Sequence, residues 1–252
     1  MPMLPTRQIL GLPFFTGPLD QAVQAAWQGA LVVAPSGPNL ANELRDLPAY
    51  REAVQRADVV LTDSAAMVAM HRWVTGEVVP RHSGLAYVRA LLASAPVSEK
   101  VFWVMPSATE AEAIGAWLRA RAWPCGPDNC HVAPHYAAGE IQDEVLLARL
   151  QAVQPRLVVI NLAGGKQEVL GAWLKSRLPP ATGVVCTGAA IAFLAGTQAA
   201  IPAWADRAGL GWLLRCLSKP AKFVPRYWSA LPLLGMVARH RNRLPPARPG
   251  RP

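Results

Sequence analysis

The sequence predicts an α/β protein with a mostly parallel sheet, helices on both faces, and a basic helical appendage at the C-terminus. Short apolar runs alternate with amphipathic stretches along most of the chain, a rhythm typical of parallel sheets covered by helices. Apolar residues make up 52% of the 252 residues, enough for a large core. The net charge of +9 comes entirely from residues 204–252, which hold ten lysines and arginines and a single acidic residue, Asp206.

The first predicted unit covers residues 1–95 and contains three apolar runs separated by helical stretches. Thr16 has the side chain of an N-cap for the first helix, and Pro35 and Pro38 predict a turn before the second. The expected strands are 8–15, 31–34 and 59–61, and the expected helices are 18–28, 39–56, 65–74 and 84–93.

The second unit, residues 96–203, shows the alternation more clearly, and a third unit, 204–252, breaks it. The third unit is rich in Trp, Arg and Pro, and its final residues, 244–252, are expected to be disordered. The strands expected in the second unit are 100–105, 130–133, 156–162 and 184–187, and its helices are 108–122, 141–154 and one that ends at residue 178.

Two predicted strands end in residues suited to a ligand, because ligands bind at the carboxyl ends of strands in such sheets. Asp63 follows the strand 59–61 and opens a helix, so its carboxylate could take a proton from an attacking hydroxyl group. The alternative is that Asp63 only caps that helix. Gly188 follows the strand 184–187 in a run of small residues and is a weaker candidate.

A glycine-rich loop joins another predicted strand to its helix. Gly164 and Gly165 allow close approach of the backbone, and a helix N-terminus favours an anion such as a diphosphate. Lys166 would add positive charge, and Gln167 could bind a base or a sugar. The spacing is not that of a Walker loop. An ordinary tight turn is the alternative interpretation.

The C-terminal segment interleaves tryptophans with basic residues. Aromatic and apolar side chains bordered by arginines suit a lipid headgroup interface, and arginines also bind phosphates with a forked geometry. The alternative is a helix that packs its tryptophans on the body and leaves solvated charges outside. No nucleic-acid-binding module is recognisable, so nucleic acid is not an expected partner. The residues concerned are Trp204, Trp212, Trp228, Arg215, Arg226, Arg239, Arg241 and Arg243.

The sequence predicts neither a metal site nor a membrane span. Cys125, Cys130, His131 and His135 lie close in sequence, but their spacing fits no common zinc pattern. The first ten residues do not have the pattern of a secretory signal, and no window approaches the roughly 20 apolar residues of a membrane-spanning helix. We therefore expect a cytoplasmic protein, peripheral to a membrane, whose four cysteines are thiols.

Four segments, in their order along the chain, resemble the WecG/TagA/CpsF family of bacterial glycosyltransferases (glycosyltransferase family 26). One is similar to a family segment that ends in Asp-Gly, and one to its Gly-x-Pro-x-Gln-Glu loop. The other two resemble its glycine segment and its C-terminal signature. The similarity extends over most of the chain, from about residue 8 to residue 228. The segments are 57–63, 164–168, 187–196 and 202–227.

This resemblance implies a Rossmann-like, inverting glycosyltransferase that uses a UDP-sugar and needs neither metal nor cofactor. The acceptor would be a polyprenyl-diphosphate-linked sugar at the inner face of the cytoplasmic membrane. The implied pathways are teichoic acid linkage, enterobacterial common antigen, capsule or exopolysaccharide synthesis. A homo-oligomer is left open.

The resemblance also assigns site residues. Asp63 would be the base, and the arginines that match the family's C-terminal signature would close over the donor diphosphate. The expected nucleotide-sugar site comprises Gly164, Gly165, Lys166, Gln167, Glu168, Gly188, Arg215 and Arg226. The expected membrane contact comprises Trp228, Arg239, Arg241 and Arg243.

The chain departs from the family's pattern at several positions, most of which are usually polar or charged in the family. The surviving Asp63 and Lys-Gln-Glu loop favour an active enzyme. The alternative is a catalytically inactive homologue that acts as a membrane-bound scaffold in polysaccharide assembly. The departures are the stretch 34–36, Ser64, Ala86, Ala192, the stretch 200–202 and Gly211, and the changes at Ala34, Ala86 and Ala192 bear most directly on activity.

Overall fold

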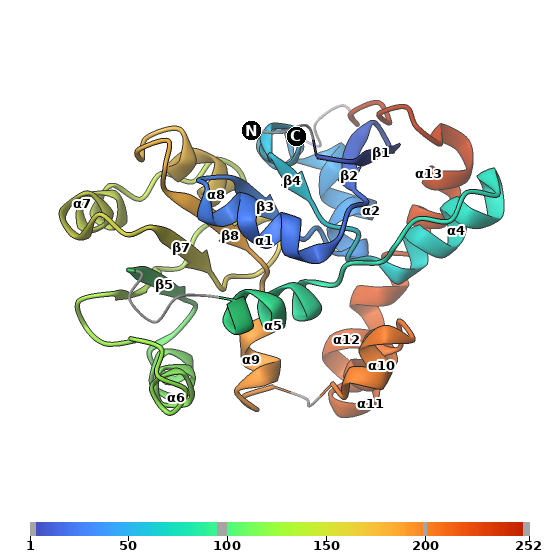
Figure 1. The fold of residues 1–252 in the computed structure, drawn as a ribbon. Helices are drawn as coiled ribbons and strands as arrows, with labels where there is room; N and C mark the ends of the chain where they lie inside the picture. The colour runs from blue at the N-terminus through green and yellow to red at the C-terminus, as the bar shows by residue number, and fades with distance from the viewer. Residues whose placement is uncertain (1–3, 95–99, 199–200, 249–252) are drawn as a thin grey trace.

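The strands are β1 (Thr6–Ile9), β2 (Leu12–Phe15), β3 (Leu31–Val33), β4 (Val59–Val60), β5 (Val101–Met105), β6 (Cys130–Val132), β7 (Leu157–Ile160) and β8 (Gly183–Cys186). They form one sheet in the order β1-β2-β4-β3-β8-β7-β5-β6, in a computed structural model that describes residues 4–94, 100–198 and 201–248 (Figure 1). Every neighbouring pair is parallel except β1 and β2. The predicted mostly parallel sheet is therefore confirmed.

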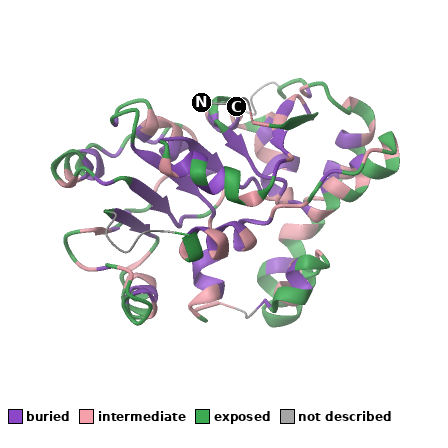
Figure 2. Ribbon diagram, viewed as in Figure 1, coloured by how far each residue is buried: buried purple, intermediate pink, exposed green. Residues whose placement is uncertain are grey.

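The helices that flank the sheet are α1 (Leu19–Trp27), α2 (Gly37–Asp46), α3 (Pro48–Arg56), α4 (Ala65–Thr75), α5 (Gly84–Ser94), α6 (Ala108–Arg119), α7 (Glu144–Val153), α8 (Lys166–Lys175) and α9 (Ala190–Leu194). One hydrophobic cluster joins the sheet to α2, α3, α7 and α8, and a second joins it to α1, α5, α6 and α9. The strands from β2 to β5 in the order of the sheet are buried between these layers, whereas the edge strands β1 and β6 are partly exposed (Figure 2). Helices thus cover both faces, as predicted.

Both predicted units contribute to this one sheet, because β3 of the first pairs directly with β8 of the second. The carboxyl ends of the parallel strands from both units therefore lie along one edge. The division of the chain at residues 95 and 203 stays a prediction.

Three sequence predictions about local structure are wrong. The strand expected over 8–15 is a hairpin, since Leu10 and Gly11 have φ of 53° and 71°, as a two-residue hairpin turn requires. The helix expected over 39–56 is interrupted at Leu47, which is extended because proline follows it. Thr16 does not cap α1, whose N-cap position is Pro18.

The C-terminal segment forms the helices α10 (Ala203–Arg207), α11 (Gly211–Ser218), α12 (Pro220–Trp228) and α13 (Pro232–His240). Helix α13 packs against α4 and α2 and buries Leu233, Met236 and Val237 in the core. Helices α10 to α12 are mostly exposed (Figure 2). The basic helical appendage is therefore confirmed, and its last helix is part of the body.

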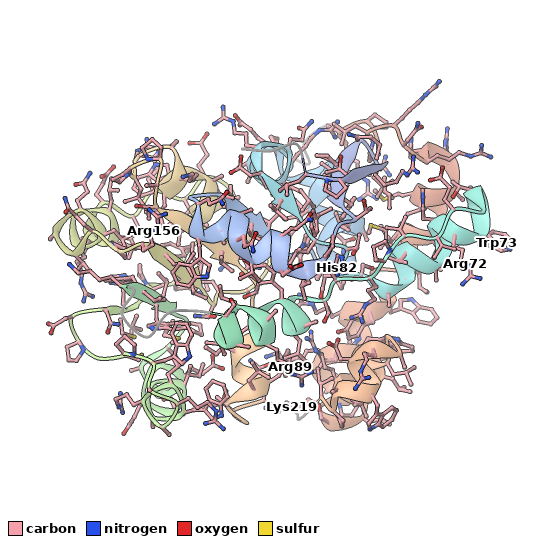
Figure 3. All side chains as sticks on the ribbon, viewed as in Figure 1. Arg72, Trp73, His82, Arg89, Arg156 and Lys219 are labelled. Carbon is pink, nitrogen blue, oxygen red and sulfur yellow. The ribbon has the colours of Figure 1, made fainter. Side chains whose placement is uncertain are left out.

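Two tryptophans of the appendage face outward: Trp204 and Trp228 are 63% and 74% exposed, so the alternative that they pack on the body is wrong for these two. Trp212 is 47% exposed and packs edge-on against Tyr227. Trp73 on α4 is also largely exposed and points away from the body (Figure 3). Within the described ranges, no helix is both long enough and apolar enough to cross a membrane.

The disorder expected over 244–252 is wrong for the part that the structure describes. Leu244 lies so close to Gly11 that a side chain at Gly11 would clash with it. The guanidinium of Arg248 pairs with Asp46 at 2.9 Å, and Arg51 donates to the Pro245 carbonyl at 2.7 Å. These contacts attach the end of the chain to α2 and α3. Residues 249–252 lie outside the described residues.

Candidate functional site

A cavity of about 530 Å³ opens between the carboxyl edge of the sheet and the C-terminal helices. The loops that follow β3, β4, β5, β7 and β8 form its floor, and α11 and α12 form the opposite wall. Asp63 and Gln167 lie on the floor, whereas Arg215 and Arg226 lie on the wall. The predicted acid and the predicted arginines therefore meet across one cavity.

Asp63 is held by the first residue of α5. Its Oδ1 accepts a hydrogen bond from the Gly84 amide at 2.9 Å. Helix α4 is capped by Ser64, whose hydroxyl accepts from the Met67 amide, so the alternative role of Asp63 as a helix cap is wrong. Burial raises the pKa of Asp63, against the opposing effects of the Gly84 amide, Arg81 and Arg215. A raised pKa makes this carboxylate a stronger proton acceptor than an exposed aspartate.

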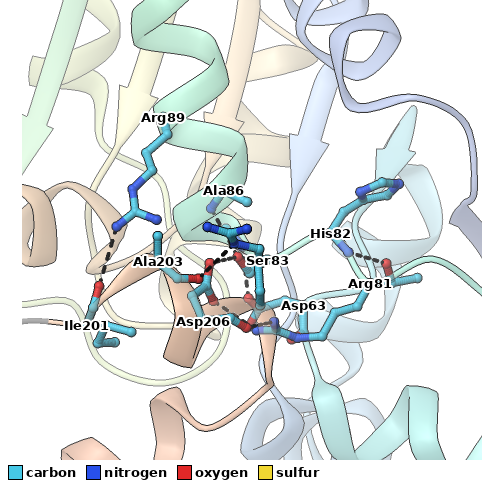
Figure 4. A network of polar contacts seen from close by, with 12 residues as sticks. Asp63, Arg81, His82, Ser83, Ala86, Arg89, Ile201, Ala203 and Asp206 are labelled. Atoms are coloured by element: carbon cyan, nitrogen blue, oxygen red, sulfur yellow. Dashed lines mark hydrogen bonds and ion pairs between the residues drawn. The ribbon is translucent and has the colours of Figure 1, made fainter.

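The segment before α5 also contains polar residues that the sequence did not single out. Thr62 fixes it by donating to the Pro80 carbonyl at 2.7 Å and accepting from the His82 amide at 2.8 Å. Arg81 and Ser83 both contact the carboxylate of Asp206, at 3.2 and 2.6 Å (Figure 4). Arg81, Ser83 and Asp206 all line the cavity. The available signal was Asp206 itself, the single acid of residues 204–252.

Gln167 connects two loops of the floor. Its side chain is 2% exposed, and its Oε1 accepts from the Gly188 amide at 2.7 Å. Its Nε2 donates to Glu168 at 3.1 Å, and Glu168 in turn accepts from the Gly165 amide at 2.7 Å. Glu168 is fully buried, and burial raises its pKa to about 7. The glycine-rich loop is therefore held from beneath by this buried carboxyl.

The structure brings only part of the expected nucleotide-sugar site to the cavity surface. Gly164, Gln167 and Gly188 line it, together with the two wall arginines. Gly165 and Glu168 belong to the loop and its support and are not among the lining residues. The Lys166 ammonium donates to the Tyr136 carbonyl, away from the lining. Contributions of these three residues to binding stay predictions.

The wall arginines have different surroundings. The guanidinium of Arg215 lies 4.2 Å from the centre of the Phe193 ring, and its Nη1 is 3.4 Å from the Tyr227 hydroxyl. Arg226 also lines a second cavity of about 200 Å³, together with Glu43. Burial raises the pKa of Glu43, which Arg226 opposes. Arg226 is thus shared by two adjoining cavities.

Asn39, which the sequence reasoning missed, lies where these two cavities meet. It is 4% exposed, accepts from the Ser36 hydroxyl, and lines both cavities. Gly164 lies so close to the Asn39 amide that any side chain at Gly164 would clash with it. This close packing by itself explains why position 164 is a glycine, without any contribution from a ligand.

The apolar departures from the family's pattern occupy different places. Ala34 and Gly211 line the cavity. Ala86 is outside the lining, and its amide donates to the Ser83 hydroxyl at 3.0 Å. Ala192 is buried in the core. Within the described ranges, no three His, Cys, Asp or Glu side chains come together as metal ligands would.

Comparisons with known proteins identify the family of this chain. The chain matches the family model "Glycosyl transferase WecG/TagA/CpsF family" over residues 7–246. It is similar to proteins of several Staphylococcus aureus strains named N-acetylglucosaminyldiphosphoundecaprenol N-acetyl-beta-D-mannosaminyltransferase. The identity is 18% over 189 residues, which cover 74% of this chain and 72% of each relative. Because the family model spans nearly the whole chain, this protein belongs to the WecG/TagA/CpsF family of glycosyltransferases.

Proposed function

We propose that this glycosyltransferase moves a hexosyl group from a UDP-sugar to a polyprenyl-diphosphate-linked sugar. The observation that carries the proposal is the placement of Asp63 opposite Arg215 and Arg226 in one cavity. A proton acceptor and two phosphate-binding groups are what such a transfer requires. The names of the relatives support a lipid-linked acceptor.

The proposed reaction is a single displacement. The acceptor hydroxyl attacks the anomeric carbon while the bond to the UDP oxygen breaks, so the anomeric configuration inverts. Asp63 takes the hydroxyl proton, and its raised pKa favours this role at neutral pH. Negative charge develops on the departing diphosphate, where Arg215, Arg226 and the N-terminus of α8 stabilise it. These groups supply the positive charge in the proposed step, which uses no metal ion.

We further propose that the protein binds the inner face of the cytoplasmic membrane beside the mouth of the cavity. Leu231 and Leu234 line the cavity, while neighbouring Trp228 is largely exposed. The side chains of Arg239, Arg241 and Arg243, at and beyond the end of α13, are exposed as well. This arrangement would let the acceptor keep its polyprenyl chain in the bilayer while its sugar enters the cavity.

The test is UDP release from a panel of UDP-sugars in the presence of a polyprenyl-diphosphate-linked sugar, comparing wild type with Asp63→Asn. Loss of the base is expected to lower kcat by roughly 10²–10⁴-fold with little change in UDP affinity. Asp128→Asn changes an exposed acid on the α6–β6 loop and serves as the matched control. Near-normal turnover of Asp63→Asn would eliminate Asp63 as the base. If wild type turns over no donor, the scaffold alternative is favoured.

A further inference from the structure

Asp206 is an unusual member of the appendage. It is the single acid among ten basic residues over 204–252, and it is 6% exposed although α10 itself is short and mostly exposed. Burying a carboxylate is costly unless it is paired and hydrogen-bonded. A surface helix that only needed solubility would leave such a residue in water.

Both carboxylate oxygens of Asp206 are occupied by the segment before α5. The Arg81 guanidinium contacts Oδ1 at 3.2 Å and also donates to the Asp206 backbone carbonyl. The Ser83 hydroxyl donates to Oδ2 at 2.6 Å (Figure 4). Asp206 lies 125 positions after Arg81 and 123 positions after Ser83, so these contacts join two distant segments of the chain at a buried point.

The same stretch of chain, together with the first residue of α5, holds Asp63. The Nε of Arg81 donates to the Asp63 backbone carbonyl at 3.1 Å. The Gly84 amide, one residue beyond Ser83, donates to the Asp63 carboxylate at 2.9 Å. A contact made by α10 is therefore transmitted to the candidate base through a single stretch of chain.

We propose that Asp206 is a positioning residue that couples docking of the C-terminal helices to the electrostatic environment of Asp63. The proposal rests on the role of Asp63 as the base. With α10 docked, the charge of Arg81 is balanced by Asp206. With α10 undocked, Asp63 would be the carboxylate that remains beside Arg81. The two would form an ion pair, and Asp63 would then be a poor proton acceptor. Asp63 would be free of the Arg81 ion pair, and able to act as the base, only when the wall of the cavity is in place.

The charges around Asp63 determine the direction in which each variant should shift its pKa. Arg81 and Arg215 favour the ionised form of Asp63, whereas Asp206 disfavours it, and the Gly84 amide is the neutral donor. Removing the charge of Asp206 should therefore lower the pKa of Asp63, and removing the charge of Arg81 should raise it. Mere loosening of the fold would move both variants in the same direction.

The experiment compares full-length wild type, Asp206→Asn, Arg81→Gln and Ser83→Ala. One readout is the titration of Asp63 by NMR of protein labelled with ¹³C at aspartate carboxyls, with Asp63→Asn identifying the signal. The midpoint is expected to fall by about one pH unit in Asp206→Asn and to rise in Arg81→Gln. The acid limb of the kcat/KM profile should move with it. A second readout is limited trypsin digestion, in which cleavage after Arg207 and Arg215 should become severalfold faster in Asp206→Asn.

Ser83→Ala weakens docking without changing any charge, so it should speed digestion and lower the midpoint of Asp63 in the same direction as Asp206→Asn, but by less. The proposal is overturned if both charge variants shift the midpoint the same way, or if neither shifts it. Should Asp206→Asn not fold, a midpoint in Arg81→Gln that fails to rise overturns it. If the charge variants shift the midpoint as expected but Asp63→Asn transfers sugar at a near-normal rate, the role of Asp63 as base is refuted and the coupling of charges stands.

Discussion

The floor and the wall of the cavity are built in opposite ways. On the floor, Gln167 and Glu168 are almost completely buried and hydrogen-bonded to each other and to the loops that they support. On the wall, α11 has no buried residue and α12 has one, Phe223. A floor fixed by buried hydrogen bonds is ready for its ligand, whereas a wall with few buried contacts adjusts at little cost.

This difference has a simple physical origin. The floor residues follow strands whose backbones are fixed by their neighbours in the sheet. Helix α10 and the wall helices α11 and α12 contain five, eight and nine residues, and isolated helices shorter than about 12 residues are marginal in water. Their order therefore depends on docking. The contacts that dock them include the small apolar cluster of Leu85, Phe193 and Ile201 with Leu214, and the buried Asp206.

Replacing both wall arginines should produce the largest effect if the wall supplies the charge for the departing diphosphate. A hydrogen bond to a charged group contributes about 1.5–3 kcal/mol, so Arg215→Ala with Arg226→Ala should lower kcat/KM by roughly 10²–10⁴-fold. Donor titrations and UDP-release assays measure this. The matched control is Arg207→Ala with Lys219→Ala, two exposed cations outside the cavity lining, one at the end of α10 and one between α11 and α12. An equal loss in the control would mean that net charge, and not the wall's geometry, matters.

Membrane binding should depend on the appendage and not on the floor. Changing Arg239, Arg241 and Arg243 to glutamine is expected to weaken binding to anionic vesicles by about a hundredfold, or about fivefold per arginine. Sedimentation with phosphatidylglycerol vesicles measures it. Substitution is preferable to truncation, because α13 buries core residues.

The control for this measurement removes three exposed arginines from the body, at positions 121, 156 and 177. Equal losses in the two triple variants would show that binding reports overall charge. The distinction between a body and a membrane-facing appendage would then fail.

The buried support of the floor should give the smallest effect, seen in stability. Burial raises the pKa of Glu168 to about 7 in the folded protein. Between about pH 4.5 and pH 7, Glu168 therefore keeps its proton in the folded state but is ionised in the unfolded state. Glu168 should therefore destabilise the protein progressively as pH rises through that range. Burial raises the pKa of Asp63 and Glu43 too, so only a comparison isolates Glu168.

That comparison is the melting temperature of wild type and Glu168→Gln from pH 5 to pH 8. The melting temperature of wild type should fall relative to the variant as pH rises, by a few degrees at most. Parallel curves would mean that the carboxyl stays ionised, held by the Gly165 amide and Gln167. The control is Glu144→Gln, an exposed acid at the start of α7.

The sequence predicted which residues stand at the strand ends of the floor, but not the direction of every side chain there. Asp63, Gly164, Gln167 and Gly188 follow strands that a local apolar pattern reveals, and strand ends in a parallel sheet meet at one edge. Lys166 shares that loop but donates to Tyr136, 30 residues away, which no local pattern reports. Side-chain direction depends on such distant partners.

The chain's own order of apolar runs, glycines and charges determined the α/β fold, the position of Asp63 at a strand end, and the basic character of the appendage. Periodicity carries this information because it reflects neighbours along the chain. Only the tertiary structure decided that α13 belongs to the core, that Asn39 joins two cavities, and that Asp206 meets Arg81. Each of these depends on contacts between segments far apart in sequence, which form only when the sheet and its helices have packed.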